Sequence, residues 1–300
     1  MKYNVLGRTG LNVSAVSLGT VSLGVDYGIA APGEFGRPDE QTAIALLEEA
    51  LDRGVTLFDT APAYGDSEQL LGRAIGDNPR AIVATKTGPL DVEMSLNASR
   101  RALRRDTIDI VQIHNATAVM IADGRVIDVL DEAREQGAFR FIGASVYGEE
   151  AALAAIRSRR FDVLQVAYSV LDQRMGARVL AEAAKAGVGV LVRSALLKGV
   201  LTPKAQWLPD ALEPLRAAAT RARDTLARGR WDDLPAAAMR FCLSTPGVSS
   251  VLTGARTSAE LEAALSAEGE GPLDPAAVDR ARGLGLASEE LLNPSYWPVP

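Results

Sequence analysis

The chain has 300 residues, of which 47% are hydrophobic, and it carries a formal net charge of −6 at pH 7. This composition is typical of a folded protein with a large core and excludes a disordered chain, and the interspersed charges form no basic stripe for nucleic acid or an anionic membrane surface. A single cysteine, Cys242, and a single histidine, His114, exclude an intrachain disulfide and a zinc site with four Cys and His ligands.

Localisation is predicted from the same features. The N-terminal segment "MKYNVLGRTGLNVS" lacks the long apolar region of a signal peptide. No apolar run reaches the roughly 18 residues that a membrane-spanning helix needs, and a lone cysteine fits a reducing compartment. We therefore expect a cytoplasmic protein, with Cys242 at the buried end of a helix.

The chain opens with a predicted β-hairpin that turns around Arg8 to Gly10, and then alternates between short apolar runs and longer helical segments. The first helical segment begins at the cap candidate Asp39 and ends at Gly54. The eight runs lie near 15–20, 56–60, 81–86, 108–114, 141–145, 163–168, 189–194 and 249–254. The other helical segments are 66–76, 94–105, 123–137, 148–160, 173–187, 234–244 and 257–266.

Eight strand–helix repeats predict parallel strands joined by right-handed crossovers, and eight such units close into a (β/α)8 TIM barrel. No linker divides the chain, so residues 1–300 form one predicted domain. The rival, a doubly wound sheet, normally carries a glycine-rich turn after its first strand, which "LGTVSLG" does not match. The longest connection, about 195–233 after strand seven, is expected to be a functional loop or to contain extra helices.

Four reactive side chains fall at one rim of this barrel, because the C-terminal ends of barrel strands face the active site. Asp59, Lys86 and His114 end the second, third and fourth strands, and Tyr64 follows on the loop after Asp59. A tyrosine is a weak acid, but a neighbouring ammonium stabilises its phenolate and makes it a better proton donor. An aspartate can hold that ammonium, and an imidazole can orient a carbonyl oxygen. Such a site would polarise a carbonyl group and protonate the developing alkoxide.

The same positions carry a family resemblance. The segments "FDTAPAYGDSEQLLGRAI", "ATK" and "IDIVQIHN" resemble the aldo-keto reductase family, and the resemblance extends from "LGRTGLNVS" to "LTGARTSAEL". It implies a (β/α)8 barrel that reduces an aldehyde or ketone, or oxidises the corresponding alcohol or sugar, with NAD(P)(H). The catalytic residues would be Asp59, Tyr64, Lys86 and His114, with Tyr64 as the general acid and base.

The resemblance also implies a nicotinamide cofactor lying across the rim. Ser145 and Gln165 would hold its carboxamide, although Val146 replaces the usual asparagine, and Arg193 replaces an aromatic that stacks on the nicotinamide. Ser194, Leu196 and Gly199 would lie beside the pyrophosphate. The full set of implied cofactor-binding residues is Gly19, Thr20, Asp59, Ser145, Gln165, Arg193, Ser194, Leu196, Gly199, Thr253, Gly254 and Arg256.

The form of the cofactor is predicted from the last of these residues. Arg256 beside a helix start suits an anion, which favours a 2′-phosphate and therefore NADP(H). Two departures from the family pattern, Glu260 and Ala264, keep NAD(H) open, because an acid near the ribose can prefer the free hydroxyl.

The substrate is predicted only as a small carbonyl or alcohol, and the oligomeric state, monomer or homo-oligomer, stays open. Aromatic residues that could line the substrate pocket are Tyr27, Trp207, Trp231, Tyr296 and Trp297. The short segment after His114, 115–124, suggests an open pocket on that side. Two other functions are alternatives: a cofactor-sensing partner subunit with little turnover, and a metal-dependent isomerase or an aldolase that forms a Schiff base on Lys86.

Overall fold

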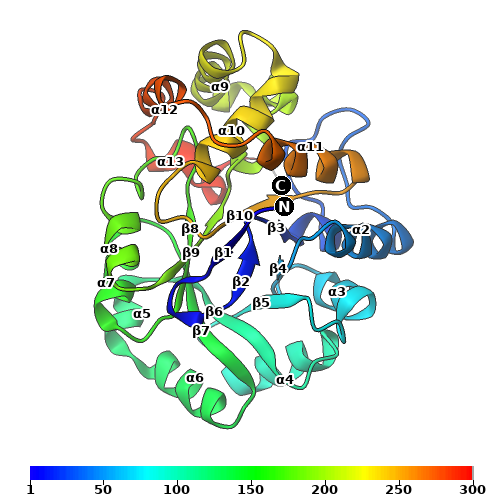
Figure 1. Ribbon diagram of the computed structural model, residues 1–300, viewed down its shortest axis with the longest axis vertical. Helices are drawn as coiled ribbons and strands as arrows, with labels where there is room; N and C mark the ends of the chain where they lie inside the picture. The colour runs from blue at the N-terminus through cyan, green and yellow to red at the C-terminus, as the bar shows by residue number, and fades with distance from the viewer. Residues whose placement is uncertain (299–300) are drawn as a thin grey trace.

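A closed barrel of eight parallel strands dominates the computed structural model, which describes residues 1–298 (Figure 1). Around the barrel the strands follow the order β10-β3-β4-β5-β6-β7-β8-β9, which confirms the predicted (β/α)8 fold. Their bounds are β3 (Val16–Gly19), β4 (Leu57–Asp59), β5 (Ile82–Thr87), β6 (Ile108–Ala116), β7 (Phe139–Val146), β8 (Val163–Ala167), β9 (Gly189–Arg193) and β10 (Ser250–Gly254).

Helices surround the barrel in Figure 1. They are α1 (Val21–Gly24), α2 (Glu40–Asp52), α3 (Ser67–Ile75), α4 (Val92–Ala102), α5 (Ala118–Asp123), α6 (Arg125–Glu135), α7 (Glu149–Ser158), α8 (Val179–Lys185), α9 (Glu213–Leu226), α10 (Leu234–Leu243), α11 (Ser258–Gly269), α12 (Pro275–Arg282) and α13 (Glu289–Leu292). Asp39 caps α2 as expected, because its carboxylate accepts a hydrogen bond from the backbone N–H of Thr42.

Two predicted segments differ from the structure. The expected helix over 173–187 begins only at Val179, because residues up to Gly176 form a turn in which the Gly176 N–H donates to the carbonyl of Gln173. The expected short loop over 115–124 contains α5. The long connection after β9, which was expected to be a functional loop or to contain extra helices, contains α9 and several short 3-10 turns.

The N-terminal hairpin closes one end of the barrel. Its strands β1 (Tyr3–Val5) and β2 (Asn12–Ser14) pair antiparallel, and Figure 1 shows them lying across the barrel. Hairpin and barrel share one buried hydrophobic cluster, made of Leu6, Leu11, Val13, Leu57, Ala84, Ile110, Val163, Leu191 and Leu252. The open end of the barrel is therefore the opposite one, at the carboxyl ends of the strands.

The barrel interior changes from apolar to polar over two residues along each strand. Side chains two residues apart in a strand point to the same face. The residues that follow the apolar cluster by two positions are Asp59, Lys86, Gln112, Gln165, Arg193 and Gly254. The period of the strands therefore places a polar layer directly above the apolar layer, at the open end.

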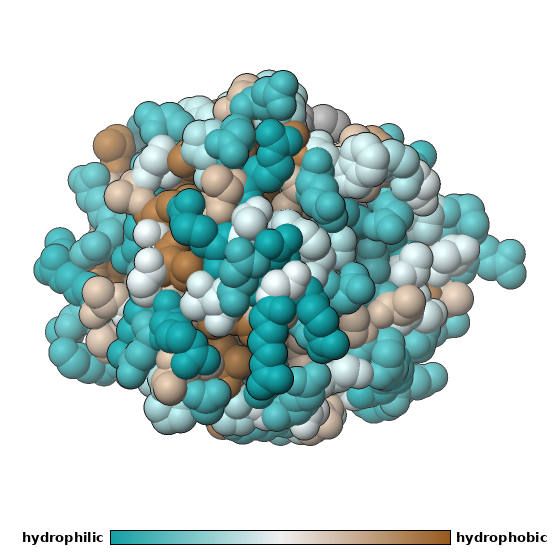
Figure 2. Space-filling view, turned by 90° about the horizontal axis from the view of Figure 1, so that it is seen from above, coloured by the Kyte–Doolittle hydropathy of each residue, from teal (hydrophilic) through white to brown (hydrophobic). Residues whose placement is uncertain are grey.

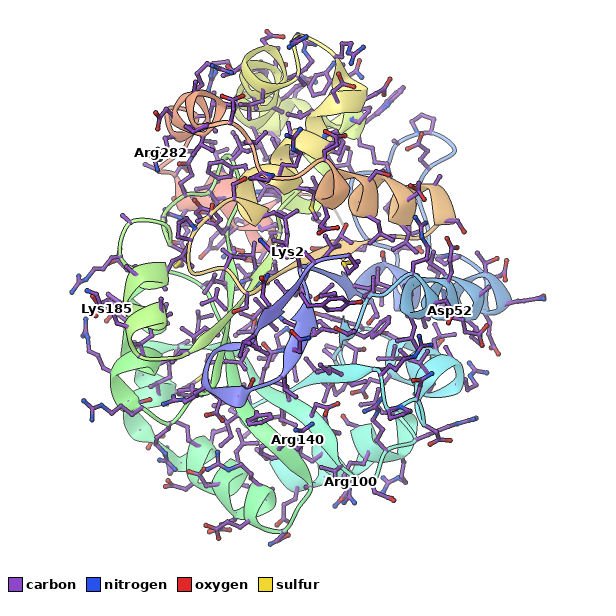
Figure 3. The ribbon with its side chains drawn as sticks, viewed as in Figure 1. Lys2, Asp52, Arg100, Arg140, Lys185 and Arg282 are labelled. Carbon is purple, nitrogen blue, oxygen red and sulfur yellow. The ribbon has the colours of Figure 1, made fainter. Side chains whose placement is uncertain are left out.

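A second and larger hydrophobic cluster fills the space between the barrel and the helices. Cys242 is fully buried in it, as expected, and burial raises the pKa of its thiol. Charged residues such as Asp52, Arg100, Lys185 and Arg282 lie at the periphery (Figure 3), and on the face shown in Figure 2 hydrophobic residues form only small patches. Within residues 1–298, no helix is both long enough and apolar enough to cross a bilayer.

Candidate active site

A buried ion pair forms the base of the site. Lys86 Nζ lies 2.6 Å from Asp59 Oδ2, and the two side chains are 1% and 5% exposed. The ammonium also donates to the carbonyl oxygen of Thr60 at 2.9 Å. Burial alone would lower the pKa of Lys86, but the Asp59 carboxylate and the Tyr64 phenol outweigh it and raise that pKa. Lys86 is therefore an ammonium at neutral pH, which disfavours the Schiff-base alternative because that chemistry needs a free amine.

Two buried amides orient the carboxylate. Gln112 Nε2 and Gln165 Nε2 both donate to Asp59 Oδ1, at 2.9 and 2.7 Å. Gln112 was missed in the sequence, although its position two residues before His114 on one strand places it in the same barrel interior. Its Oε1 is buried and has no hydrogen-bond partner among the described residues. Asp59 thus accepts from three donors, which fixes both of its oxygens.

The loop that carries Tyr64 is held close to α1 by two glycines. A Cβ atom on Gly24 would lie 1.8 Å from the carbonyl oxygen of Tyr64, and one on Gly65 would lie 2.4 Å from the carbonyl oxygen of Gly24. Gly65 also has a positive φ of 57°. The hydroxyl of Ser67 adds hydrogen bonds to Thr20 and Thr60 beneath the loop. The backbone around Tyr64 is therefore defined by close contacts that larger residues would prevent.

Tyr64 meets the other catalytic candidates at the open end of the barrel. Lys86 Nζ lies 4.9 Å from the centroid of the Tyr64 ring. The rings of Tyr64 and His114 are 6.0 Å apart and nearly perpendicular, at 88°. Burial and the nearby Lys86 ammonium lower the pKa of His114 to about 4, so its imidazole is neutral at physiological pH. The structure thus brings all four predicted catalytic residues together.

A model of the aldo/keto reductase family matches residues 15–285. This chain belongs to the aldo-keto reductase family. It is 30% identical to the aldo-keto reductase YhdN of Bacillus subtilis over 88% of this chain and 87% of that protein. It is 28% identical to L-galactose dehydrogenase of Arabidopsis thaliana over 97% of this chain and 92% of that protein.

Its fold is also that of a solved relative, the holo form of aldo-keto reductase AKR11C1 from Bacillus halodurans, with a TM-score of 0.81. That comparison covers 98% of this chain and 100% of the other at 24% identity.

The family uses nicotinamide cofactors, and the donor set of this aldo-keto reductase fits the polar end of one. Ser145 and Gln165 are buried at neighbouring strand ends, where the Ser145 hydroxyl donates to Gln165 Oε1 at 3.4 Å. A hydroxyl beside an amide can satisfy a carboxamide.

The remaining cofactor candidates of this reductase lie on adjoining segments of the same rim. Gly254 and Gly19 are register partners at the ends of β10 and β3. The segment after β9 has positive φ at Ser194 and at Gly199, and the implied pyrophosphate neighbours lie there. Thr20, in contrast, is fully buried, and its hydroxyl bonds to the carbonyl of Asp59. Of the other two cofactor candidates, Leu196 is half-buried and Thr253 is buried.

Arg193 is fixed on the opposite side of the site. Its guanidinium lies 3.9 Å from the centroid of the Tyr147 ring, and Nη2 donates to the carbonyl of Val146 at 3.1 Å. It forms no ion pair among the described residues. Tyr27 belongs to the same group: burial and the neighbouring Tyr147 raise the pKa of Tyr27 to about 12, against the effect of Arg193. Tyr27 is thus the aromatic candidate that the structure places near Tyr64, one of the predicted catalytic residues.

The other aromatic candidates for the substrate pocket have different surroundings. Trp297 is 6% exposed, packs in the large hydrophobic cluster and donates to the carbonyl of Glu290. Trp231 packs against the same cluster and under the Arg223 guanidinium. Trp207 and Tyr296 are more than half exposed. Packing explains the buried Trp297 and the half-buried Trp231 without a ligand.

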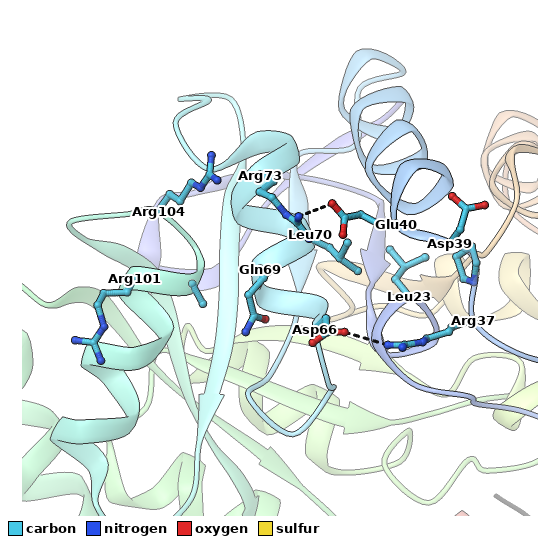
Figure 4. A pocket seen from close by; sticks show the side chains of 12 residues that line it. Leu23, Arg37, Asp39, Glu40, Asp66, Gln69, Leu70, Arg73, Arg101 and Arg104 are labelled. Carbon is cyan, nitrogen blue, oxygen red and sulfur yellow. Dashed lines mark hydrogen bonds and ion pairs between the residues drawn. The ribbon is translucent and has the colours of Figure 1, made fainter.

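A separate groove of about 710 Å³ lies between α2, α3 and α4, and contains none of the four predicted catalytic residues (Figure 4). It is lined mainly by charged side chains. Arg37 pairs with Asp66, and Arg73 pairs with Glu40. These pairs neutralise much of the charge along the groove, and we assign it no role in the reaction.

Proposed function

We propose that this protein is a nicotinamide-dependent oxidoreductase that reduces an aldehyde or ketone, or oxidises the corresponding alcohol or sugar, with Tyr64 as the proton donor. The observation that carries this proposal is the meeting of a phenol, a buried ammonium and a neutral imidazole at one open barrel end. The name of the relative L-galactose dehydrogenase supports a polyhydroxylated substrate.

Each side chain has a defined part in the proposed reaction. A reduced nicotinamide would supply the hydride. Neutral His114 can donate one N–H to the carbonyl oxygen and so orient it, while Tyr64 gives its hydroxyl proton to the alkoxide that forms. The phenolate left on Tyr64 is stabilised by Lys86, whose charge is held in place by Asp59. Ser145 and Gln165 would hold the carboxamide of the cofactor.

For the reverse reaction the same groups work in the opposite sense. The Tyr64 phenolate accepts the proton of an alcohol, because one transition state serves both directions. The sequence favours NADP(H) through Arg256, but the ion pair of that residue with Glu260 supports NAD(H) instead.

The test is consumption of NADH or NADPH with a panel of aldehydes, ketones and sugars. We expect turnover in the wild type and a fall of at least 100-fold in kcat for Tyr64→Phe, which removes one hydroxyl. The matched control is Tyr3→Phe, since the Tyr3 hydroxyl bonds to Gly54 at the closed end of the barrel. Full turnover in Tyr64→Phe would refute the assigned proton donor, and absence of turnover with every pair would refute the proposed activity.

A further inference from the structure

Four charged side chains gather where β10 leads into α11. Glu260, in the first turn of α11, contacts both Arg256 and Lys204. Lys204 also pairs with Glu34, which comes from the loop before α2. The cluster therefore joins three segments that are far apart in the sequence, and its two cations are matched by two carboxylates.

The Glu260 carboxylate folds back onto Arg256, the residue just before the cap of α11. Thr257 caps α11 by accepting the backbone N–H of Glu260. In return, Glu260 accepts the backbone N–H of Arg256 at 2.8 Å and its Nη2 at 2.9 Å. This pattern resembles a capping box, in which a glutamate three residues after the cap satisfies free backbone donors. The chain thus brings its own anion to the backbone N–H and the guanidinium of Arg256.

The guanidinium of Arg256 is also used on its other side. Nη1 donates to the carbonyl oxygen of Glu34 at 2.6 Å and to that of Gly36 at 3.3 Å. The Arg256 side chain is only 14% exposed. A phosphate could therefore bind Arg256 only after these bonds were broken, or by sharing donors that already have acceptors.

Glu260 is charged at neutral pH. Burial raises the pKa of its carboxyl, but the hydrogen bonds and the charge of Arg256 outweigh burial and lower that pKa below its usual value. A dianionic phosphate beside this carboxylate would meet repulsion in a partly buried setting, where screening by solvent is weak. A ribose hydroxyl, in contrast, could donate a hydrogen bond to it.

We propose that Glu260 makes this protein selective for NAD(H) over NADP(H), by holding Arg256 and by accepting a hydrogen bond from a free ribose hydroxyl. This inference rests on the proposed nicotinamide-dependent activity. It reverses the cofactor preference that Arg256 alone indicates and favours the NAD(H) alternative that Glu260 kept open, because the structure shows that this carboxylate holds the Arg256 guanidinium.

The test compares two nucleotides that differ only in the 2′-phosphate. Calorimetric titration of the full chain with 5′-AMP and with 2′,5′-ADP measures binding without turnover. We expect the dissociation constant of 2′,5′-ADP to exceed that of 5′-AMP in the wild type, and their ratio to fall by about tenfold or more in Glu260→Gln. The ratio of kcat/KM for NADH and NADPH should shift in the same direction.

Glu262→Gln is the matched control, since Glu262 lies two residues along α11 and pairs with Arg53 outside the cluster. It should leave both ratios unchanged. A wild-type protein that binds 2′,5′-ADP at least as tightly as 5′-AMP would overturn the inference, even if Glu260→Gln proved unstable. An unchanged ratio in Glu260→Gln would overturn it too. Either result leaves the proposed activity standing, whereas failure to bind either nucleotide and to oxidise either cofactor would refute both.

Discussion

Replacing Asp59 by asparagine tests the buried ion pair at the base of the site. The change leaves the Lys86 ammonium 1% exposed, with the Thr60 carbonyl as its remaining partner. Removing one member of a buried pair typically costs about 3–5 kcal/mol, because the other charge stays uncompensated. For 300 residues, an unfolding entropy of about 2 cal/mol/K per residue converts this loss into a fall in melting temperature of roughly 5–8 °C.

The matched comparison is Lys86→Met, which removes the opposite charge. In that variant the Asp59 carboxylate keeps the amides of Gln112 and Gln165 as donors. We therefore expect a smaller loss of unfolding free energy than in Asp59→Asn. Melting temperatures from circular dichroism at pH 7 measure both.

The stability of the wild type and that of Asp59→Asn should depend differently on pH. In the wild type the pKa of Lys86 is raised, so the stability from the pair is fully present below the unfolded value of about 10.4 and is lost as pH rises through the folded value. In Asp59→Asn, burial without a carboxylate would lower the pKa of Lys86, so the folded protein binds fewer protons than the unfolded chain and gains stability as pH rises. The difference in melting temperature between the wild type and Asp59→Asn should therefore narrow between about pH 7 and pH 9.5.

Three results would refute this reasoning. They are an Asp59→Asn melting temperature within about 1 °C of the wild type at pH 7, a larger loss in Lys86→Met, or a gap that widens with pH. Each would mean that the carboxylate does not compensate the buried ammonium as the 2.6 Å contact implies.

Three further predictions address the groups around the pair. Gln112→Leu should lower kcat by about tenfold with the melting temperature nearly unchanged, because it removes a donor to Asp59 together with an unpaired acceptor; an unchanged kcat would contradict the positioning role. Gly24→Ala should lower kcat/KM by about 100-fold, since its Cβ would collide with the Tyr64 backbone, whereas Gly269→Ala meets nothing within 4 Å and should leave kcat/KM unaltered. Nuclear magnetic resonance should show His114, the only histidine, titrating near pH 4, and a midpoint near 6.5 would contradict the lowering of its pKa by burial and by Lys86.

The local pattern of the sequence determined the barrel and the positions of the four predicted catalytic residues. Apolar runs of strand length that alternate with helical segments predict eight parallel strands, and a side-chain period of two fixes which residues face inward. Asp59, Lys86 and His114 could therefore be placed on one rim before any coordinates were known. The cap at Asp39 was equally readable, because its partner is three residues away.

Other features depended on contacts between distant segments, which only the tertiary structure shows. Arg256 predicts a phosphate site when only its own helix start is considered, yet its guanidinium donates to a carbonyl 222 residues away. Gln112 donates a hydrogen bond to Asp59, which lies 53 residues earlier in the chain on another strand of the barrel. Whether a charge is free to bind a ligand depends on every partner within a few ångströms, and chain folding decides those partners. The sequence therefore determined which groups are present at the rim, and the fold decided which of them remain available.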